Sequence, residues 1–231
     1  MNNYSEDETL VFNNRHGELL KITKKYKAIE LRRNQLKTIP DILPENIEYL
    51  DISDNLIQAP NIEKFTSLKV LDLGYNLLLN HNSIKNKSLV ELYLMSNDIL
   101  EISSSIIHLT NLKKFDIANN RISNLDILHY ISPTIEELYL GNNKIKEFTC
   151  NLTHLTRLRV LDLQFNNLTE FDCSLLPSSV EVLLLNNNYN LKLIKNKRFF
   201  ELIDTEETKV TSKSLSSLNT VLNAGSDDTN E

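Results

Sequence analysis

The chain has 231 residues, of which 41% are hydrophobic and 24% are charged, and its formal net charge at pH 7 is −6. A chain of this length and composition has enough apolar area for a packed core. It is therefore neither a miniprotein that depends on disulfides nor an intrinsically disordered protein. The acidic residues are dispersed and no basic stripe is present, so the composition argues against a nucleic-acid-binding protein.

The N-terminal segment, residues 1–27, begins with MNNYSEDETLVF, which is acidic and contains no long apolar run. It is unlike a secretory signal, and no stretch of the chain approaches the ~18 apolar residues that a membrane span needs. We therefore expect a cytoplasmic or nuclear protein that does not bind membranes. The segment itself predicts an N-terminal cap, in which Leu19, Leu20 and Ile22 turn toward the core.

Residues 28–194 contain eight copies of an apolar phrase that ends in asparagine. The phrase is L-x-x-L-x-L-x-x-N or a close variant, and the asparagines lie 21 to 23 residues apart. Apolar residues alternate with others before each asparagine, which predicts a short strand with one buried face. One copy cannot bury that face alone, so successive copies must stack, and each asparagine amide can bond backbone groups left unpaired by a turn. These asparagines, here called the asparagine ladder, are Asn34, Asn55, Asn76, Asn97, Asn120, Asn143, Asn166 and Asn188.

Two details within the repeats carry expectations of their own. His81 stands where an apolar residue is expected, which predicts a local bulge. Cys150 and Cys173 each lie seven residues after a ladder asparagine, so they occupy equivalent positions on adjacent coils. In the absence of an export signal, we expect two small buried side chains rather than a disulfide.

Residues 195–204, KNKRFFELID, follow the last repeat and predict a C-terminal cap. The end of a stacked array needs apolar side chains to cover its last coil. The residues expected to do so are Phe199, Phe200, Leu202 and Ile203.

Residues 205–231 are rich in Ser, Thr, Asn and acidic residues, which predicts a disordered tail. Leu215, Leu218 and Leu222 follow one another at spacings of three and four residues, and they would form a short apolar stripe if a partner made the segment helical. The simpler interpretation is a solvated tail in which the leucines occur by chance.

The repeat length and the apolar phrase resemble those of leucine-rich-repeat proteins. This resemblance implies an α/β class, right-handed solenoid with a curved parallel sheet on its concave face and short helices or irregular coils on its convex face. Units such as NKIKEFTCNLTHLTRLRVLDLQFN are similar to the intracellular repeats of Ras-interacting and scaffold proteins, and somewhat less to those of the regulatory subunit of protein phosphatase 1. The stretch LKTIPDILPENIEYLDISDN is instead similar to the shorter repeats of bacterial effector proteins.

A binding surface is expected on the strand residues that face the concave side. Counting back from the ladder asparagines gives a central column of acids and tyrosines, with further aromatic residues beside it and at the strand exits. Aromatic residues are enriched at interfaces, and a row of acids favours Lys or Arg on the partner. Aspartate at this position can also simply bond its neighbours, and the convex side, an edge or the tail are the competing binding sites. The predicted protein-binding residues are Tyr49, Asp51, Asp72, Tyr75, Tyr93, Asp116, Tyr139, Asp162 and Phe165.

The sequence contains little that would support catalysis. Four glycines leave no phosphate-binding loop, and the five histidines show no metal-ligand spacing. Hydrolysis by paired carboxylates would need a closed groove and one acid in an apolar site, which an open ribbon does not supply. We therefore expect no catalytic residues, no cofactor and no metal.

Together these features predict a monomeric, non-catalytic protein-interaction module, either an intracellular scaffold or a regulatory subunit. Its partner would be a protein with a basic or mixed basic and apolar surface, with no nucleic acid and no membrane involved. Two alternatives stay open: a protein similar to the regulatory subunit of protein phosphatase 1, and a secreted pathogen effector that lacks a catalytic domain.

Overall fold

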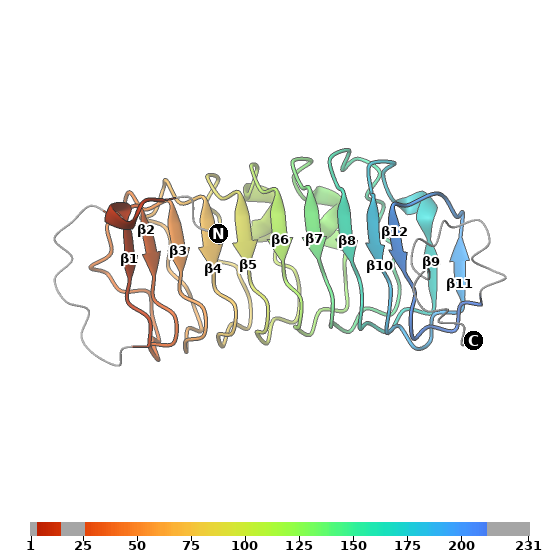
Figure 1. Cartoon of the computed structure of the whole chain (residues 1–231), viewed down its shortest axis with the longest axis horizontal. Coiled ribbons are helices and arrows are strands. Elements are labelled where there is room, and N and C mark those ends of the chain that lie inside the picture. Colours follow the sequence, from red (N-terminus) through yellow and green to blue (C-terminus); the bar gives the residue numbers. More distant parts are fainter. Residues whose placement is uncertain (1–3, 15–25, 212–231) are drawn as a thin grey trace, which may run out of the picture.

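The structure, a computed structural model, describes residues 4–14 and 26–211. Ten strands in this part of the chain form one parallel sheet, and Figure 1 shows them side by side along the long axis of the molecule. The expected solenoid with a parallel sheet on one face is confirmed. Its strands, in spatial order, are β1 (Thr9–Val11), β2 (Ala28–Glu30), β3 (Tyr49–Asp51), β4 (Val70–Asp72), β5 (Glu91–Tyr93), β6 (Lys114–Asp116), β7 (Glu137–Tyr139), β8 (Val160–Asp162), β10 (Val182–Leu184) and β12 (Leu202–Asp204).

Each strand has three residues, and from β2 onward the middle one is buried while the third faces the concave side. In β4, for example, Leu71 is fully buried and Asp72 is half-buried. Neighbouring strands pair in straight register, so Leu71 lies between Leu50 and Leu92. Equivalent leucines and isoleucines therefore stack into a single core that runs from Ile29 to Ile203.

Short 3-10 helices and irregular coils connect the strands. No α-helix occurs in residues 4–14 and 26–211, and no helix there is long and apolar enough to cross a membrane. Figure 1 shows η2 and η3 behind the sheet, on the convex face. A second, two-stranded parallel sheet lies near the C-terminal end. These elements are η1 (Glu6–Glu8), η2 (Ser104–His108), η3 (Asp126–Tyr130), η4 (Cys173–Leu175), and the paired strands β9 (Glu170–Asp172) and β11 (Leu193–Lys195).

The ladder asparagines bond the turns that follow the strands, as Asn120 illustrates. Its Nδ2 donates to the carbonyl oxygens of Ile117 and Ala118 in its own coil, at 3.1 and 3.0 Å. The same nitrogen donates to the Leu94 carbonyl of the preceding coil at 3.0 Å, and Oδ1 accepts from the Ile99 N–H at 3.0 Å. The structural role predicted for the ladder is confirmed.

Consecutive ladder asparagines also share acceptors. The Ile117 carbonyl accepts from both Asn120 and Asn143, at 3.1 Å each. The Leu140 carbonyl accepts in the same way from Asn143 and Asn166. Each coil is thus hydrogen-bonded to the next through side chains as well as through the sheet.

The N-terminal part contains a strand that the repeat pattern did not predict. β1 pairs in parallel with β2 and extends the sheet by one strand. Part of the predicted N-terminal cap is therefore an additional coil of the solenoid. Leu19, Leu20 and Ile22, which were expected to turn inward, lie outside the described residues.

The predicted C-terminal cap likewise contributes a strand, because β12 pairs with β10. Phe200 and Ile203 are buried as expected, but the prediction for Phe199 is wrong, since this side chain is 60% exposed. Only one of two consecutive phenylalanines can turn toward the core when the backbone is extended.

Residues after 205 still contact the solenoid, although the sequence predicted disorder from this point. The Glu206 carbonyl accepts from the Asn187 N–H, and the Lys209 N–H donates to the Leu191 carbonyl, both at 2.9 Å. Val210 packs against the core. Residues 212–231, including the Leu215, Leu218 and Leu222 stripe, lie outside the described part of the chain.

His81 lies in the segment between β4 and β5, and the two strands on either side of it pair in straight register. The side chain is fully buried, and its Nε2 accepts from the Ser103 N–H at 2.9 Å. The Ser105 hydroxyl lies 3.2 Å from Nδ1. Burial lowers the pKa of His81 to about 4, so the ring is a neutral, hydrogen-bonded core residue at pH 7.

Candidate protein-binding surface

The third residues of the strands form a continuous row on the concave face. Direct register partners connect Asp51 to Asp72, Asp72 to Tyr93 and so on along the sheet. Because paired strands lie about 4.8 Å apart, each predicted side chain has the next as its immediate neighbour. At the two ends the row continues through Val11 and Asp204, which sequence reasoning missed. The predicted members that the structure brings together are Asp51, Asp72, Tyr93, Asp116, Tyr139 and Asp162.

Asp51 is less available to a partner than the sequence suggested. It is fully buried, and its Oδ1 accepts from the N–H and the hydroxyl of Ser53, at 3.1 and 2.7 Å. Its Oδ2 accepts from Nε of Arg32, on the neighbouring coil, at 2.5 Å. The chain itself therefore neutralises this acid, and its main role is structural.

Asp72 and Asp116 are the acids that remain open. Oδ1 of each accepts from a backbone N–H, that of Gly74 at 2.8 Å and that of Ala118 at 3.0 Å. No hydrogen bond or ion pair reaches Oδ2 of either acid from the described residues. A Cβ at Gly74 would lie 3.1 Å from Oδ1 of Asp72, so glycine here keeps the carboxylate approachable.

The surroundings of these acids disfavour their charge. Burial and the neighbouring charge of Asp51 raise the pKa of Asp72 to about 6, and burial raises the pKa of Asp116 and of Asp162. Asp72 is still mostly ionised at pH 7, but only at the expense of fold stability. Acids kept in such surroundings are candidates for a functional site.

Replacing Asp72 by Asn should stabilise the fold at pH 7.5 by about 2–3 kcal/mol, because roughly two pKa units correspond to this free energy. The folded protein holds the Asp72 proton more tightly than the unfolded chain does. The contribution of Asp72 to stability therefore falls as pH rises from about 4 to about 6. The increase in the free energy of unfolding of the Asp72→Asn variant should therefore reach its full value above pH 7 and vanish near pH 4.

Urea unfolding curves at several pH values measure this difference. The matched control is Asp41→Asn, because Asp41 is exposed. A variant as stable as the parent protein at pH 7.5 would contradict the strained environment assigned to Asp72.

Tyr93 and Tyr139 are held in place by a lysine that the sequence analysis did not select. Nζ of Lys114 lies 5.7 Å from the Tyr93 ring centroid and 5.0 Å from that of Tyr139. Lys114 also forms an ion pair with Glu137 at 2.7 Å. The hydroxyls of Tyr93 and Tyr139 donate to Glu91 and Glu137, at 2.6 and 2.9 Å. The rings are thus fixed before a partner arrives, which reduces the entropy lost on binding.

Tyr49 and Asp162 border this centre and are more strongly engaged by their own neighbours. Burial raises the pKa of Tyr49 to about 12, and its hydroxyl lies 3.5 Å from Oδ2 of Asp51. Asp162 is buried and accepts from both the N–H and the side-chain amide of Gln164, at 2.9 and 3.0 Å. We therefore place the accessible part of the site around Asp72, Tyr93 and Asp116.

Tyr75 and Phe165 lie at the strand exits, each immediately before a ladder asparagine. Both side chains are about half exposed, and their φ angles of 54° and 53° are in the left-handed region. Bulky residues rarely adopt this conformation, and such strain is often found at binding sites. The equivalent position in the other repeats has Arg33, Asp54, Ser96, Asn119, Asn142 and Asn187.

A polar row separates these two aromatic residues. Nδ2 of Asn142 donates to Oδ1 of Asn119 at 2.6 Å, and Nδ2 of Asn119 donates to the Ser96 hydroxyl at 2.7 Å. Four strand spacings, or about 19 Å, lie between Tyr75 and Phe165. This distance suits a protein surface rather than a small molecule.

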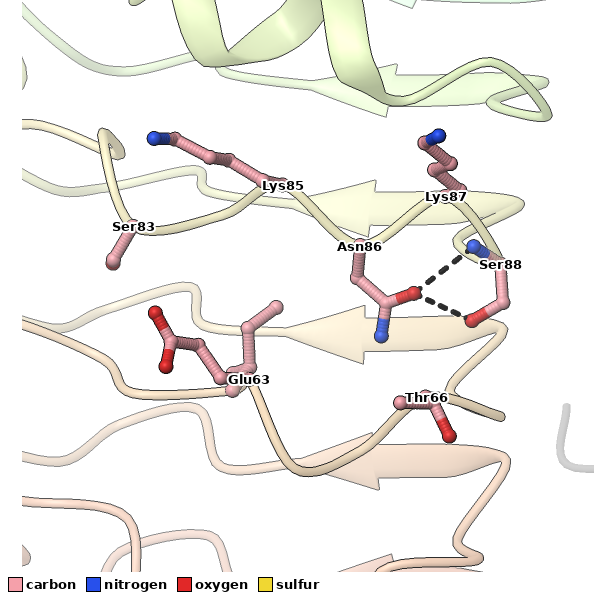
Figure 2. Close-up of a pocket in the computed structure, with 8 residues that line it drawn as sticks. Glu63, Thr66, Ser83, Lys85, Asn86, Lys87 and Ser88 are labelled. Carbon is pink, nitrogen blue, oxygen red and sulfur yellow. Dashed lines mark hydrogen bonds between the residues drawn. The ribbon is translucent and has the colours of Figure 1, made fainter.

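A hollow of about 400 Å³ lies between two coils away from the concave row. Figure 2 shows that the side chains of Lys85 and Lys87 extend away from Asn86, while Asn86 and Ser88 are bonded to each other. These groups do not converge on one ligand position. In the described part of the chain, no group of three or more His, Cys, Asp or Glu side chains could hold a metal ion. The concave face is the better candidate for the main site.

Stacked coils with a short parallel strand each, eight of them followed by a ladder asparagine at intervals of 21 to 23 residues, have the repeat pattern of a leucine-rich-repeat solenoid. A family model described as Leucine Rich Repeat matches residues 157–178. The sequence resemblance to this repeat class is confirmed.

Solved structures with similar folds come from bacteria and plants. A leucine-rich-repeat protein of Leptospira interrogans is 25% identical, with 84% of this chain and 54% of that chain covered and a TM-score of 0.64. An internalin of Listeria monocytogenes is 22% identical, with 86% and 62% covered and a TM-score of 0.64. The plant peptide hormone receptor RGFR1, in complex with RGF2, is 18% identical, with 84% and 39% covered and a TM-score of 0.56. This chain thus spans less than two thirds of each of these proteins.

Proposed function

We propose that this protein is a non-catalytic scaffold or regulatory subunit that binds a protein partner on its concave face. The observation that carries the proposal is Asp72, which keeps an open carboxylate at the expense of stability. The fold does not need this charge, because an asparagine could accept the same bond from Gly74.

The partner chemistry follows from the two open acids and the ring between them. Asp72 and Asp116 flank Tyr93 in adjacent strands. A lysine or arginine of the partner would relieve the unfavourable charge of Asp72, and an apolar neighbour would cover the Tyr93 ring. A basic and apolar protein surface therefore fits best. The plant receptor of similar fold, solved with RGF2 bound, supports a binding role for such a solenoid.

We further propose that the protein acts as a monomer in a reducing compartment such as the cytoplasm. Cys150 and Cys173 are free and buried, as the sequence predicted. Burial raises the pKa of Cys150 to about 12 and that of Cys173 to about 11. Both thiols are thus unreactive, and their unpaired state fits a compartment in which disulfides are rare.

Affinity capture with three forms of the protein tests the binding face. The forms are the parent chain, Asp72→Asn with Asp116→Asn, and the control Asp41→Asn with Asp126→Asn, which removes two exposed charges elsewhere. Quantitative mass spectrometry should identify proteins that the parent and the control retain equally. The amount captured by the Asp72→Asn, Asp116→Asn variant should fall by about tenfold or more, because central interface acids contribute much more to affinity than exposed acids at the rim.

Binding of such a partner should also weaken as pH falls below about 6, because protonation removes the charge of Asp72. Equal capture by the concave variant, with all three proteins folded, would move the interface away from this row. Copurification with a phosphatase catalytic subunit would favour the phosphatase-regulatory alternative.

A further inference from the structure

The middle of the concave face contains a cationic side chain that lies between two aromatic rings. Figure 1 shows β5, β6 and β7 side by side near the middle of the sheet. Tyr93 and Tyr139 are the third residues of the two outer strands, and Lys114 is the first residue of the strand between them. Because β5 and β7 lie about 10 Å apart, one ammonium group fits between the two rings. The Nζ atom of Lys114 has this position, at 5.7 Å from one ring centroid and 5.0 Å from the other.

The two rings are also oriented by bonds that do not involve Lys114. The hydroxyl of each tyrosine donates to the glutamate two residues before it, at 2.6 Å in β5 and 2.9 Å in β7. The rings therefore stay oriented when the lysine ammonium group leaves. The place between them, here called the ammonium slot, consists of Glu91, Tyr93, Asp116, Glu137 and Tyr139.

The ammonium slot contains more negative charge than Lys114 neutralises. Three carboxylates lie around this single ammonium group, those of Glu91, Asp116 and Glu137. Lys114 pairs with Glu137 at 2.7 Å, whereas no ion pair reaches Glu91 and no bond reaches Oδ2 of Asp116 from the described residues. Burial opposes the ionisation of Glu137, but the bonds from Lys114 and Tyr139 outweigh it and lower its pKa. The slot can therefore neutralise a second cation.

This combination of residues occurs at one place in the large sheet. Of its ten described strands, only β6 begins with a basic residue, and only β6 has a tyrosine opposite its third residue on both sides. The fold does not require a lysine at this position, because Val70, Val160 and Val182 occupy it in other strands. A lysine between two tyrosines is thus a feature of the surface rather than of the repeat.

Lys114 can leave the slot without opening the core. Its side chain is 30% exposed and lies on the concave face. Glu91 is directly opposite Lys114 on one neighbouring strand, as Glu137 is on the other, so the lysine has a second carboxylate with which to pair. An incoming cation would then pair with Glu137 and with Oδ2 of Asp116. Two cations balance the three acids better than one does.

We propose that the ammonium slot binds the side-chain ammonium group of a lysine on the partner, and that Lys114 occupies the slot until this lysine displaces it. The proposal rests on the proposed function, because it names the group of the partner that the concave face binds. The group that the chain itself places in the slot is a compact ammonium with three donors rather than a planar guanidinium. We therefore expect a lysine of the partner rather than an arginine.

Occupation of the slot by Lys114 weakens the binding of any other cation. If the slot is free about one tenth of the time, the apparent affinity for an external ammonium group falls about tenfold. Removal of the Lys114 charge should restore this affinity. If Lys114 served only to hold the rings in place, its removal should weaken binding instead. The two roles therefore predict changes of opposite sign.

The test uses the full chain and Nα-acetyl-lysine methylamide, a probe with one ammonium group and no other charge. Binding is followed by NMR from the backbone amide signals of β5, β6 and β7. Lys114→Met should bind the probe about tenfold more tightly than the parent chain does. The matched control is Lys113→Met, which changes the net charge equally but removes a lysine that pairs with Glu136. This control should bind the probe as weakly as the parent chain.

Two further measurements assign the binding to the rings and to the charge. Adding Tyr93→Leu and Tyr139→Leu to Lys114→Met should abolish probe binding, because leucine keeps apolar bulk but not the ring face that attracts a cation. Nα-acetyl-norleucine methylamide, which has a similar stem and no ammonium group, should not bind Lys114→Met.

Several results would overturn the proposal. The first is equal or weaker probe binding by Lys114→Met than by the parent chain, and the second is an equal gain in Lys113→Met. Undiminished binding after the two leucine substitutions would exclude the rings, and tighter binding of Nα-acetyl-arginine methylamide would overturn the assignment to lysine.

None of these measurements uses a captured partner, so the two proposals can fail separately. If the probe binds as expected while capture is unaffected by Asp72→Asn with Asp116→Asn, the proposed function fails and the slot remains a cation-binding site. If capture depends on these acids while Lys114→Met gains no affinity for the probe, the displacement of Lys114 fails and the proposed function stands.

Discussion

Replacing Asn120 by alanine should lower the free energy of unfolding by about 3 kcal/mol, the sum of one unpaired buried N–H and several weakened bonds. The Ile99 N–H loses the acceptor that Oδ1 of Asn120 provides. The Ile117 and Leu94 carbonyls are less affected, because Asn143 and Asn97 still donate to them. The unpaired N–H therefore accounts for much of the loss.

Chemical denaturation measures this change directly. The matched control is Asn167→Ala, since Asn167 is also an asparagine of a turn but is exposed, and surface changes of this kind usually stay within about 0.5 kcal/mol. If Asn120→Ala unfolded at the same denaturant concentration as the parent protein, the role assigned to the ladder would be wrong.

The second large effect concerns binding through the tyrosines. Replacing Tyr93 and Tyr139 by alanine should weaken binding of the partner to the concave face. The expected loss of binding free energy is about 2 kcal/mol or more for each ring, or about 30-fold in affinity, if both rings act as central anchors. Phenylalanine at the same positions should retain most of the affinity, because it keeps the ring and loses only the bond to the neighbouring glutamate. Isothermal calorimetry with the captured partner gives both values.

Measuring affinity at several salt concentrations separates the contribution of the tyrosine rings to binding from that of the acids. The tyrosine variants should keep the salt dependence of the parent protein, whereas Asp72→Asn should reduce it, since screening acts on charges. Tyr130→Ala is the matched control, because this tyrosine is 64% exposed and lies on η3, away from the concave row. Full affinity of the alanine variants would exclude the rings as anchors.

Alternation and asparagine spacing were sufficient to predict most of the sheet. They identify which residue of each strand is buried, and equal spacing places equivalent residues in register, as with Leu50, Leu71 and Leu92. The pattern did not predict the first and last strands, β1 and β12, because the ladder position that follows each of them is not asparagine. It is Arg15 after β1 and Thr208 after β12.

Accessibility within the concave row could not be predicted in the same way. The pattern shows that Asp51 and Asp72 lie on one face, but it does not show which neighbouring side chain covers them. Arg32 lies over Asp51, whereas Gly74 leaves Asp72 open. Lys114 was also not selected, although the repeat spacing places it opposite Glu91 and Glu137 on the neighbouring strands.

The shared acceptors of the asparagine ladder affect how the molecule moves. Because the Ile117 carbonyl bonds Asn120 and Asn143, the opening of one coil also removes a bond from the next. We therefore expect adjacent coils to open together rather than one at a time. The concave row consequently behaves as a stiff template with a fixed spacing between its side chains. A flexible partner segment would have to adapt its own conformation to that spacing when it binds.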